Sequence, residues 1–124
     1  MVRAPRLVVS PKNLAYYISG HGFGHYARSI PVLKQLVADF KIHIKSEIKE
    51  SLFTKFLKKN ICYWPQSVDT GCRHFTSLKV DSEETFKCFN DFQNHSKLEA
   101  EKLWLQENQI ALVLSDVASM PIKA

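Results

Sequence analysis

Residues 14–28 read Leu-Ala-Tyr-Tyr-Ile-Ser-Gly-His-Gly-Phe-Gly-His-Tyr-Ala-Arg, an apolar segment that runs directly into a glycine-rich turn. The apolar residues 14–18 are typical of a strand that is covered on both faces in a parallel sheet. Beyond the turn, apolar residues recur at three- and four-residue steps and predict a helix: Ala27, Ile30, Leu33, Leu36, Val37 and Phe40. A strand, a glycine-rich turn and a helix in this order form the first unit of an open α/β sheet.

The turn itself has the composition of a ligand site. Three glycines alternate in it with two histidines and a phenylalanine, in the order Gly20, His21, Gly22, Phe23, Gly24 and His25. Glycine allows positive φ and a close approach of the backbone to a ligand, and amides at the start of the next helix face an anion. Ligands of open α/β sheets lie beyond the carboxyl ends of the strands, so we expect the site at residues 19–28.

Pro31 leaves the start of the helix open between two positions. A start at His25 places the proline beyond the first turn, where it kinks the helix. A start near Ser29 places it inside the first turn at little cost.

Further strands and helices follow in alternation. We expect strands at 41–46, 61–64 and 109–117, the first of them half-exposed because its polar and apolar residues alternate. Helices are expected around 52–59 and over 82–108, and residues 66–80 are interpreted as a loop on the rim of the site. The buried stripe of the long helix is expected to contain Phe86, Phe89, Phe92 or Gln93, Ser96, Ala100 and Leu103. This succession predicts an α/β fold, a Rossmann-like doubly wound parallel sheet of order 3-2-1-4.

Length and composition indicate one globular domain. The 124 residues are 45% hydrophobic and 23% charged, and we assign 1–13 to a flexible leader and 14–124 to the domain. The net charge of +5 is interpreted as a solvated basic face, with no nucleic-acid partner expected. No apolar run approaches the roughly 18 residues of a membrane span and no convincing signal peptide is present, so we expect a cytoplasmic protein. The three cysteines are expected to be free thiols.

His25 and Asp116 are the candidate catalytic pair. An imidazole near pKa ~6.5 can deprotonate a hydroxyl when a carboxylate holds its tautomer. In a 3-2-1-4 sheet the carboxyl ends of the first and fourth strands are neighbours, so both side chains project into one crevice. The alternative is that each residue caps a helix. Arg28 is either a clamp for carboxylate or phosphate or a surface ion pair, and Phe23 either stacks on a sugar ring or plugs the loop.

Other ligand classes fit the turn less well. The spacing of His21 and His25 lacks the glutamate of a zinc-binding His-Glu-x-x-His helix, so no metal is expected. A dinucleotide site would need a third glycine where His25 stands, although Glu47 occupies the place of a ribose-binding acid. Gly-Lys-Ser/Thr is absent, which argues against an ATP site in this segment.

The turn resembles the start of the N-terminal domain of family 28 glycosyltransferases, which have the B-type fold. The similarity is greatest to the Gly-His-Gly-Phe-Gly-His-x-x-Arg variant, also found in the glycosyltransferase-like part of plant arabinokinase-type sugar kinases. Residues 20–25 and Arg28 carry it, and weaker matches are Asp69-Thr70-Gly71, Val80-Asp81 with Thr85, and residues 112–117.

This resemblance implies a partial, acceptor-side domain of a nucleotide-sugar-dependent glycosyltransferase that transfers a hexosyl-type group. Related plant enzymes pair a histidine after the first strand with an aspartate after a later one, which implies catalysis by His25 and Asp116. Other branches use the loop to hold acceptor phosphate, which implies binding by Gly20, His21, Gly22, Phe23, Gly24 and Arg28. The nucleotide sugar would be a co-substrate held by a second domain, without another cofactor, and this chain alone would be inactive. The alternative is a non-catalytic binding or regulatory module, as in an arabinokinase-type sugar kinase.

Overall fold

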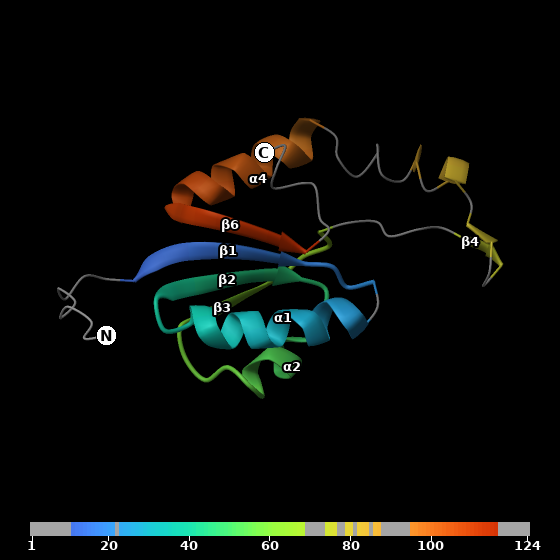
Figure 1. The fold of residues 1–124 in the computed structure, drawn as a ribbon. Coiled ribbons are helices and arrows are strands. Elements are labelled where there is room, and N and C mark those ends of the chain that lie inside the picture. The colour runs from blue at the N-terminus through green and yellow to red at the C-terminus, as the bar shows by residue number, and fades with distance from the viewer. Residues whose placement is uncertain are drawn as a thin grey trace, which may run out of the picture.

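The main sheet has four parallel strands in the order β3-β2-β1-β6 (Figure 1). The computed structural model describes residues 11–21, 23–68, 74–76, 79–80, 82–84, 86–87 and 95–116. Its elements are β1 Lys12–Ile18, α1 Phe23–Leu36, β2 Phe40–Ser46, α2 Glu50–Thr54, β3 Ile61–Pro65, β4 His74–Thr76, β5 Lys79–Val80, α4 His95–Glu107 and β6 Ile110–Asp116. The predicted α/β fold and the predicted 3-2-1-4 order are confirmed.

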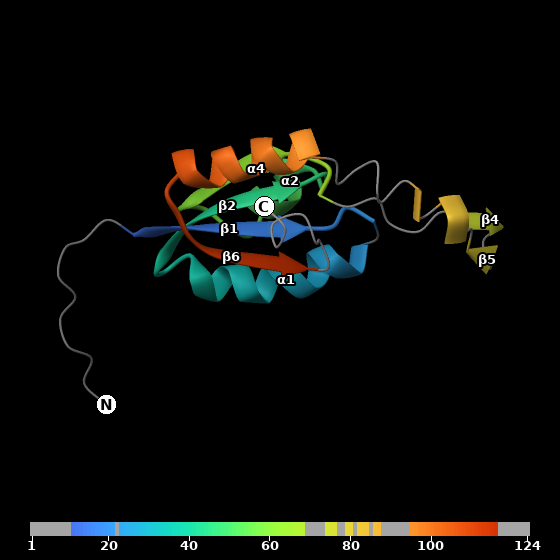
Figure 2. The same cartoon turned by 90° about the horizontal axis from the view of Figure 1, so that it is seen from above.

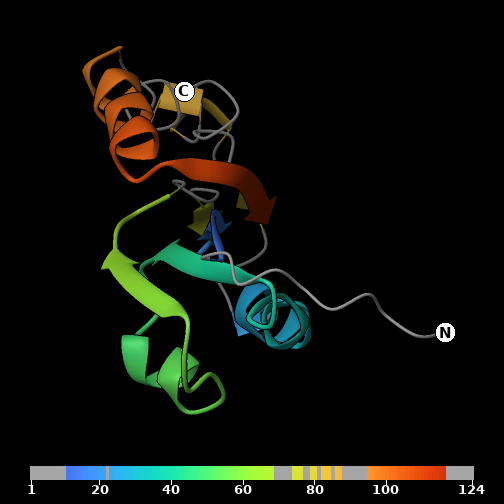
Figure 3. The same ribbon diagram turned by 90° about the vertical axis from the view of Figure 1, so that its left-hand side faces the viewer.

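Helices cover both faces of this sheet. Figure 1 and Figure 3 show α4 on one face and α1 with α2 on the other, and in Figure 2 the strands β1 and β6 lie between α4 and α1. Side chains alternate between the two faces along β1, because successive residues of a strand point to opposite sides. Leu14 and Ile18 pack in the larger core, which includes residues of α1, and Ala15 and Tyr17 pack in a smaller core beneath α4.

The strand β1 begins two residues before the expected start at Leu14. Lys12 pairs with Phe40 and Asn13 pairs with Lys41, so both residues belong to the sheet. The remainder of the expected leader, residues 1–10, lies outside the described residues.

The strand β2 is buried on both faces, and the expectation of a half-exposed strand was wrong. Ile42 and Ile44 are fully buried on the α1 side, and His43 and Lys45 are 4% and 2% exposed on the other. Alternation of polar and apolar residues predicts a solvated face only where no helix covers it. Here α4 covers that face, and both polar side chains have hydrogen-bond partners distant in sequence.

The helix α1 begins at Phe23, earlier than either expected start, so Pro31 lies in its interior. Proline has no N–H, so the carbonyl of Ala27 receives no helical hydrogen bond from position 31. Ser29 adds a side-chain bond inside the helix, because its hydroxyl donates to the carbonyl of His25 at 2.7 Å.

The expected buried stripe of the long helix was wrong. Ser96 and Ala100 are exposed, Leu103 is 54% exposed and Phe86 is 67% exposed. Among the side chains of α4 whose burial is described, that of Glu101 is buried, and the nearby Trp104 and Leu105 are partly buried. The face of α4 that packs on the sheet is therefore the one that carries Glu101, whose carboxylate accepts hydrogen bonds from residues in or directly after the strands. Phe89, Phe92 and Gln93 lie outside the described residues.

The expected loop at 66–80 contains a short antiparallel pair, β4 with β5, which the sequence did not predict. Val68, just after β3, is buried in the smaller core. Residues 69–73, which include the Asp-Thr-Gly match, lie outside the described part of the chain.

Candidate functional site

The sheet register brings the candidate catalytic residues together. Ile18, the last residue of β1, pairs with Asp116, the last residue of β6, and α1 begins shortly beyond β1. His25 lies in the first turn of that helix. Its Nδ1 is 3.0 Å from Oδ2 of Asp116, across 91 positions of sequence. The side chains are 24% and 14% exposed, so the pair is partly shielded but accessible.

Arg28 contacts both members of the pair. Its Nη2 lies 2.7 Å from Oδ1 of Asp116 and 3.0 Å from Nδ1 of His25. Nδ1 cannot accept from arginine while it donates to the carboxylate, and an ionised carboxylate has no proton to donate. Nδ1 therefore either donates to Oδ2, or accepts from Arg28 with the ring proton on Nε2, and arginine donates to Oδ1 in both tautomers. In the first tautomer, Nε2 of His25 is an acceptor that can take a proton.

The geometry of Arg28 is compatible with both of its interpretations, the surface ion pair and the clamp for an anion. The guanidinium is in an ion pair with Asp116, and its side chain is still 64% exposed. Its remaining N–H groups can therefore reach an anion at the rim of the site.

Gly20 is required by the close approach of the loop after β2. A β-carbon at this position would lie 2.9 Å from Cβ of Glu47. Gly24, in the first turn of α1, has open space around it, and a β-carbon there would meet nothing within 4 Å. The amide of His21 donates to Oγ of Ser19 at 3.2 Å, and Gly22 lies outside the described residues.

Phe23 opens onto a cleft and does not plug the loop. Its ring is 66% exposed and packs against Tyr26, with centroids 4.9 Å apart. The cleft occupies about 740 Å³, and the residues that line it include Gly20, Phe23, Tyr26, Glu47, Lys49 and Ser51. This volume is within the roughly 300–1,000 Å³ of small-molecule sites. A ring held at the edge of such a cleft can stack on an apolar ligand face.

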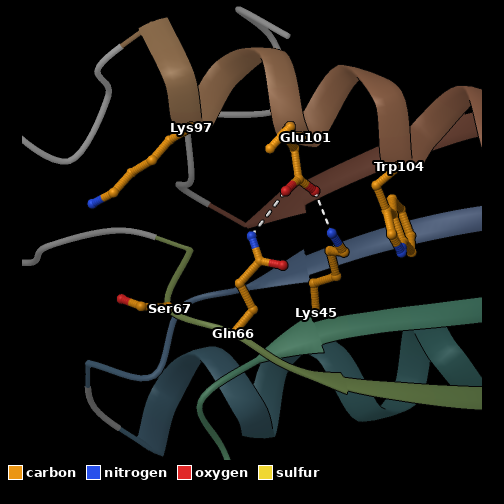
Figure 4. Close-up of a pocket in the computed structure, with 7 residues that line it drawn as sticks. Lys45, Gln66, Ser67, Lys97, Glu101 and Trp104 are labelled. Carbon is orange, nitrogen blue, oxygen red and sulfur yellow. Dashed lines mark hydrogen bonds and ion pairs between the residues drawn. The ribbon is translucent and has the colours of Figure 1, made fainter.

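A second polar cluster, which the sequence did not predict, lies on the α4 side of the sheet (Figure 4). Nζ of Lys45 is 2.5 Å from Oε1 of Glu101, and Nε2 of Gln66 donates to Oε2 at 2.9 Å. The hydroxyl of Tyr17 also donates to Oε1, and the Lys45 ammonium lies 3.6 Å from the centroid of the Trp104 ring. Four segments distant in sequence thus meet at one carboxylate.

Opposing effects set the ionisation of this cluster. Burial would raise the pKa of Glu101, but hydrogen bonds from Lys45, Tyr17 and Gln66 outweigh it and lower the pKa. Burial, together with the hydrogen bond to Glu101, raises the pKa of Tyr17, so its hydroxyl keeps the proton that it donates. The carboxylate is therefore ionised at neutral pH.

His43 is held in a separate network on the same face. Nε1 of Trp64 donates to Nδ1 of His43 at 3.1 Å, and Nε2 of His43 lies 3.1 Å from Oδ1 of Asn13. The imidazole is therefore neutral, with its proton on Nε2. Burial lowers its pKa, and the charges of Lys41 and Lys45 lower it further.

Within the described residues, no group of three His, Cys, Asp or Glu side chains could hold a metal ion. The same part of the chain contains no helix that is long and apolar enough to cross a membrane. Cys62 is a free thiol, and Cys72 and Cys88 lie outside the described residues.

Among known proteins, the chain is similar to L-arabinokinase of Arabidopsis thaliana, with 27% identity over 115 residues. The similar region covers 89% of this chain and 11% of that protein, so the chain spans about a tenth of its relative's length. No protein-family model matches the sequence. No solved structure matches it either. The chain is thus distantly similar to a sugar-related protein.

Proposed function

We propose that this chain is the acceptor-binding part of a nucleotide-sugar-dependent glycosyltransferase, with His25 as general base and Asp116 as the residue that orients it. The observation that carries the proposal is the 3.0 Å contact between Nδ1 of His25 and Oδ2 of Asp116. In this proposal Nδ1–H donates to Oδ2, and Nε2 is the proton acceptor at the carboxyl ends of β1 and β6. Ligands of doubly wound sheets bind at this edge, where the strand order reverses.

In the proposed reaction, Nε2 takes the proton of an acceptor hydroxyl. The oxygen of that hydroxyl bonds at the same time to the anomeric carbon of the donor sugar. The bond between that carbon and the nucleotide diphosphate breaks, and the diphosphate leaves with the bonding electrons. Asp116 stabilises the imidazolium that forms. In a B-type fold the donor is held mainly by a second domain.

The acceptor would lie along the glycine-rich turn. Phe23 presents an exposed ring for a sugar face, and Arg28 presents N–H groups for a carboxylate or phosphate of the acceptor. The backbone of Gly20, His21 and Gly24 would line the remainder of this site.

Two measurements test this proposal. A long-range ¹H–¹⁵N spectrum of the chain should show His25 with a protonated Nδ1 and an unprotonated Nε2, and the opposite tautomer contradicts the dyad. In transfer assays with labelled nucleotide sugars, performed on the product of the complete gene, His25→Ala should lower turnover by about 100- to 10,000-fold. The matched control is Gln35→Ala, at an exposed position of the same helix. Near-normal turnover of the His25 variant would leave that residue a structural cap.

The similarity to L-arabinokinase favours a second candidate, a non-catalytic sugar-binding or regulatory module of an arabinokinase-type sugar kinase. This function would use the same turn for binding without proton transfer. In that case His25→Ala weakens sugar binding to the chain, and the complete gene product phosphorylates a sugar but transfers none from nucleotide donors.

A further inference from the structure

We propose that the cleft between β2 and α4 is a second ligand site, which binds a neutral polyol such as a monosaccharide ring. The site is on the face of the sheet opposite α1 and is independent of the glycine-rich turn. Its lining includes Lys45, Gln66, Ser67, Lys97, Glu101 and Trp104 (Figure 4). Its volume of about 490 Å³ is within the range of roughly 300–1,000 Å³ for small-molecule sites.

Among the described residues, the buried ion pair of Lys45 and Glu101 keeps hydrogen-bonding capacity for a ligand. The side chains of Lys45 and Glu101 are 3% and 6% exposed. The carboxylate has about four acceptor positions and receives three bonds, from Lys45, Tyr17 and Gln66. The ammonium has three N–H groups. One donates to Glu101, and Nζ lies 3.6 Å from the ring centroid of Trp104 and 5.8 Å from that of Tyr17. Rings are weaker partners than an oxygen acceptor, so within the described part of the chain each ion has a position at which a ligand hydroxyl can bond.

A hydroxyl group can use both an N–H of Lys45 and an acceptor position of Glu101, because a hydroxyl accepts one hydrogen bond and donates another. A single hydroxyl can accept from Lys45 and donate to Glu101, and a vicinal diol can engage one ion with each oxygen. Trp104 adds an apolar wall, and the amide of Gln66 adds a polar group at the same carboxylate. Carboxylate, ammonium, amide and indole together suit a sugar ring, which has polar edges and apolar faces.

Charge argues for a neutral ligand. The ion pair of Lys45 and Glu101 has no net charge, so an anion entering the cleft would meet the carboxylate and a cation would meet the ammonium. Lys97 is an exposed residue of the lining, and Figure 4 shows its ammonium directed away from Glu101. An anion would therefore gain little from the inner part of the site.

Stability alone is a weak reason for this pair. Removing two charges from water costs several kcal/mol per ion, and apolar residues of similar volume often stabilise a protein equally well. A pair that lines a cleft and keeps unused bonding positions is better explained by a ligand.

The test is an NMR titration of the chain with D-galactose, L-arabinose and myo-inositol, with inorganic phosphate as the anionic probe. The chain has two tryptophans, so the two indole N–H signals can be assigned with Trp64→Phe. We expect saturable shifts at residues 45, 66, 101 and 104 with at least one polyol. Lys45→Met and Glu101→Gln should each weaken that binding about tenfold or more, the equivalent of a lost charge-assisted hydrogen bond.

Three results would overturn the proposal, and one further variant supports it. Shifts with phosphate and none with any polyol would make this an anion site. No shift with any probe would make the cluster purely structural, and this wild-type result does not depend on whether a variant folds. The double variant Lys45→Met/Glu101→Leu, which replaces both ions by apolar groups, should keep the fold and lose the binding. Loss of polyol binding in His25→Ala, with binding intact in Lys45→Met, would assign the ligand to the glycine-rich turn.

Discussion

Gly20 follows β1 and Glu47 follows β2, and the two residues lie so close together that a β-carbon on the glycine would be 2.9 Å from Cβ of the glutamate. The contact involves Cβ of Glu47, which no rotation of the side chain can move away. The ends of β1 and β2 are therefore held at a separation that only glycine permits at position 20.

Gly20→Ala should accordingly lower the free energy of unfolding by about 1–3 kcal/mol, the usual cost of overpacking. Gly24→Ala is the matched control. Its β-carbon would meet no atom within 4 Å, so alanine should stabilise α1 by about 0.5–1 kcal/mol. Urea unfolding of both variants measures the difference, and equal effects would contradict the close-approach explanation.

Pro31→Ala should raise the free energy of unfolding by about 1–3 kcal/mol. Alanine restores an N–H to the interior of α1 and provides a donor for the carbonyl of Ala27. Position 31 is exposed, so the change removes no buried contact. Thermal and urea unfolding check the prediction. A loss of stability would mean that the proline sets a helix geometry on which the packing of α1 depends.

Asp116→Asn should lower transfer activity about 10- to 100-fold, less than His25→Ala, with the far-UV circular dichroism unchanged. The amide oxygen can still accept from Nδ1–H, but the charge that stabilises the imidazolium and pairs with Arg28 is lost. Asp116→Ala provides the contrast. If Asp116→Asn is fully active and Asp116→Ala unfolds the chain, the aspartate is a structural cap.

Stability should fall as the pH decreases below about 6.5, and His43 should account for part of that decrease. Its pKa is lowered in the folded chain by burial first and then by Lys41 and Lys45. The unfolded state therefore binds a proton, near the ordinary histidine pKa of ~6.5, that the folded state does not bind until lower pH.

His43→Gln tests this assignment, because glutamine can keep bonds to Trp64 and Asn13 and does not titrate in this range. The variant should show a flatter dependence of unfolding free energy on pH from about 6.5 downward. Parallel curves for the two proteins would exclude His43 as the source. Glu101 acts in a lower window, since its lowered pKa removes stability only below the ordinary glutamate value near ~4.3.

The strand β6 should promote self-association at micromolar concentration. In the described part of the chain it pairs with β1 on one side, and Leu112 and Val113 are 42% and 37% exposed. An apolar strand with an unpaired edge is a template for another chain. Val113→Lys should lower the association in sedimentation velocity, because a charged edge opposes strand pairing.

The control for this prediction is Leu103→Lys, which introduces the same charge at a 54% exposed leucine on α4. Equal effects of the two substitutions would assign the association to general apolar exposure. A monomeric wild-type chain with one sharp unfolding transition would exclude the edge as a site of association.

Local sequence was sufficient to predict the strand order and the proximity of His25 and Asp116. The apolar strands and amphipathic helices alternate, and alternation of this kind permits few topologies, so the 3-2-1-4 order followed. That order makes the carboxyl ends of the first and fourth strands neighbours. His25 and Asp116 could therefore be paired across 91 positions from the order of the strands alone.

The tertiary structure alone decided which polar groups are buried. Periodicity predicts an exposed Lys45 on β2 and a buried Leu103 on α4, and both predictions were wrong. The helix α4 turns toward the sheet the face whose side chains find bonding partners there, although that face is not its most apolar one. Glu101 turns inward because Lys45, Tyr17 and Gln66 offer it three donors, and those donors come from three separate strands or their ends. No local pattern contains such a partnership, since the desolvation of a charge is offset only by contacts that exist after the chain has folded.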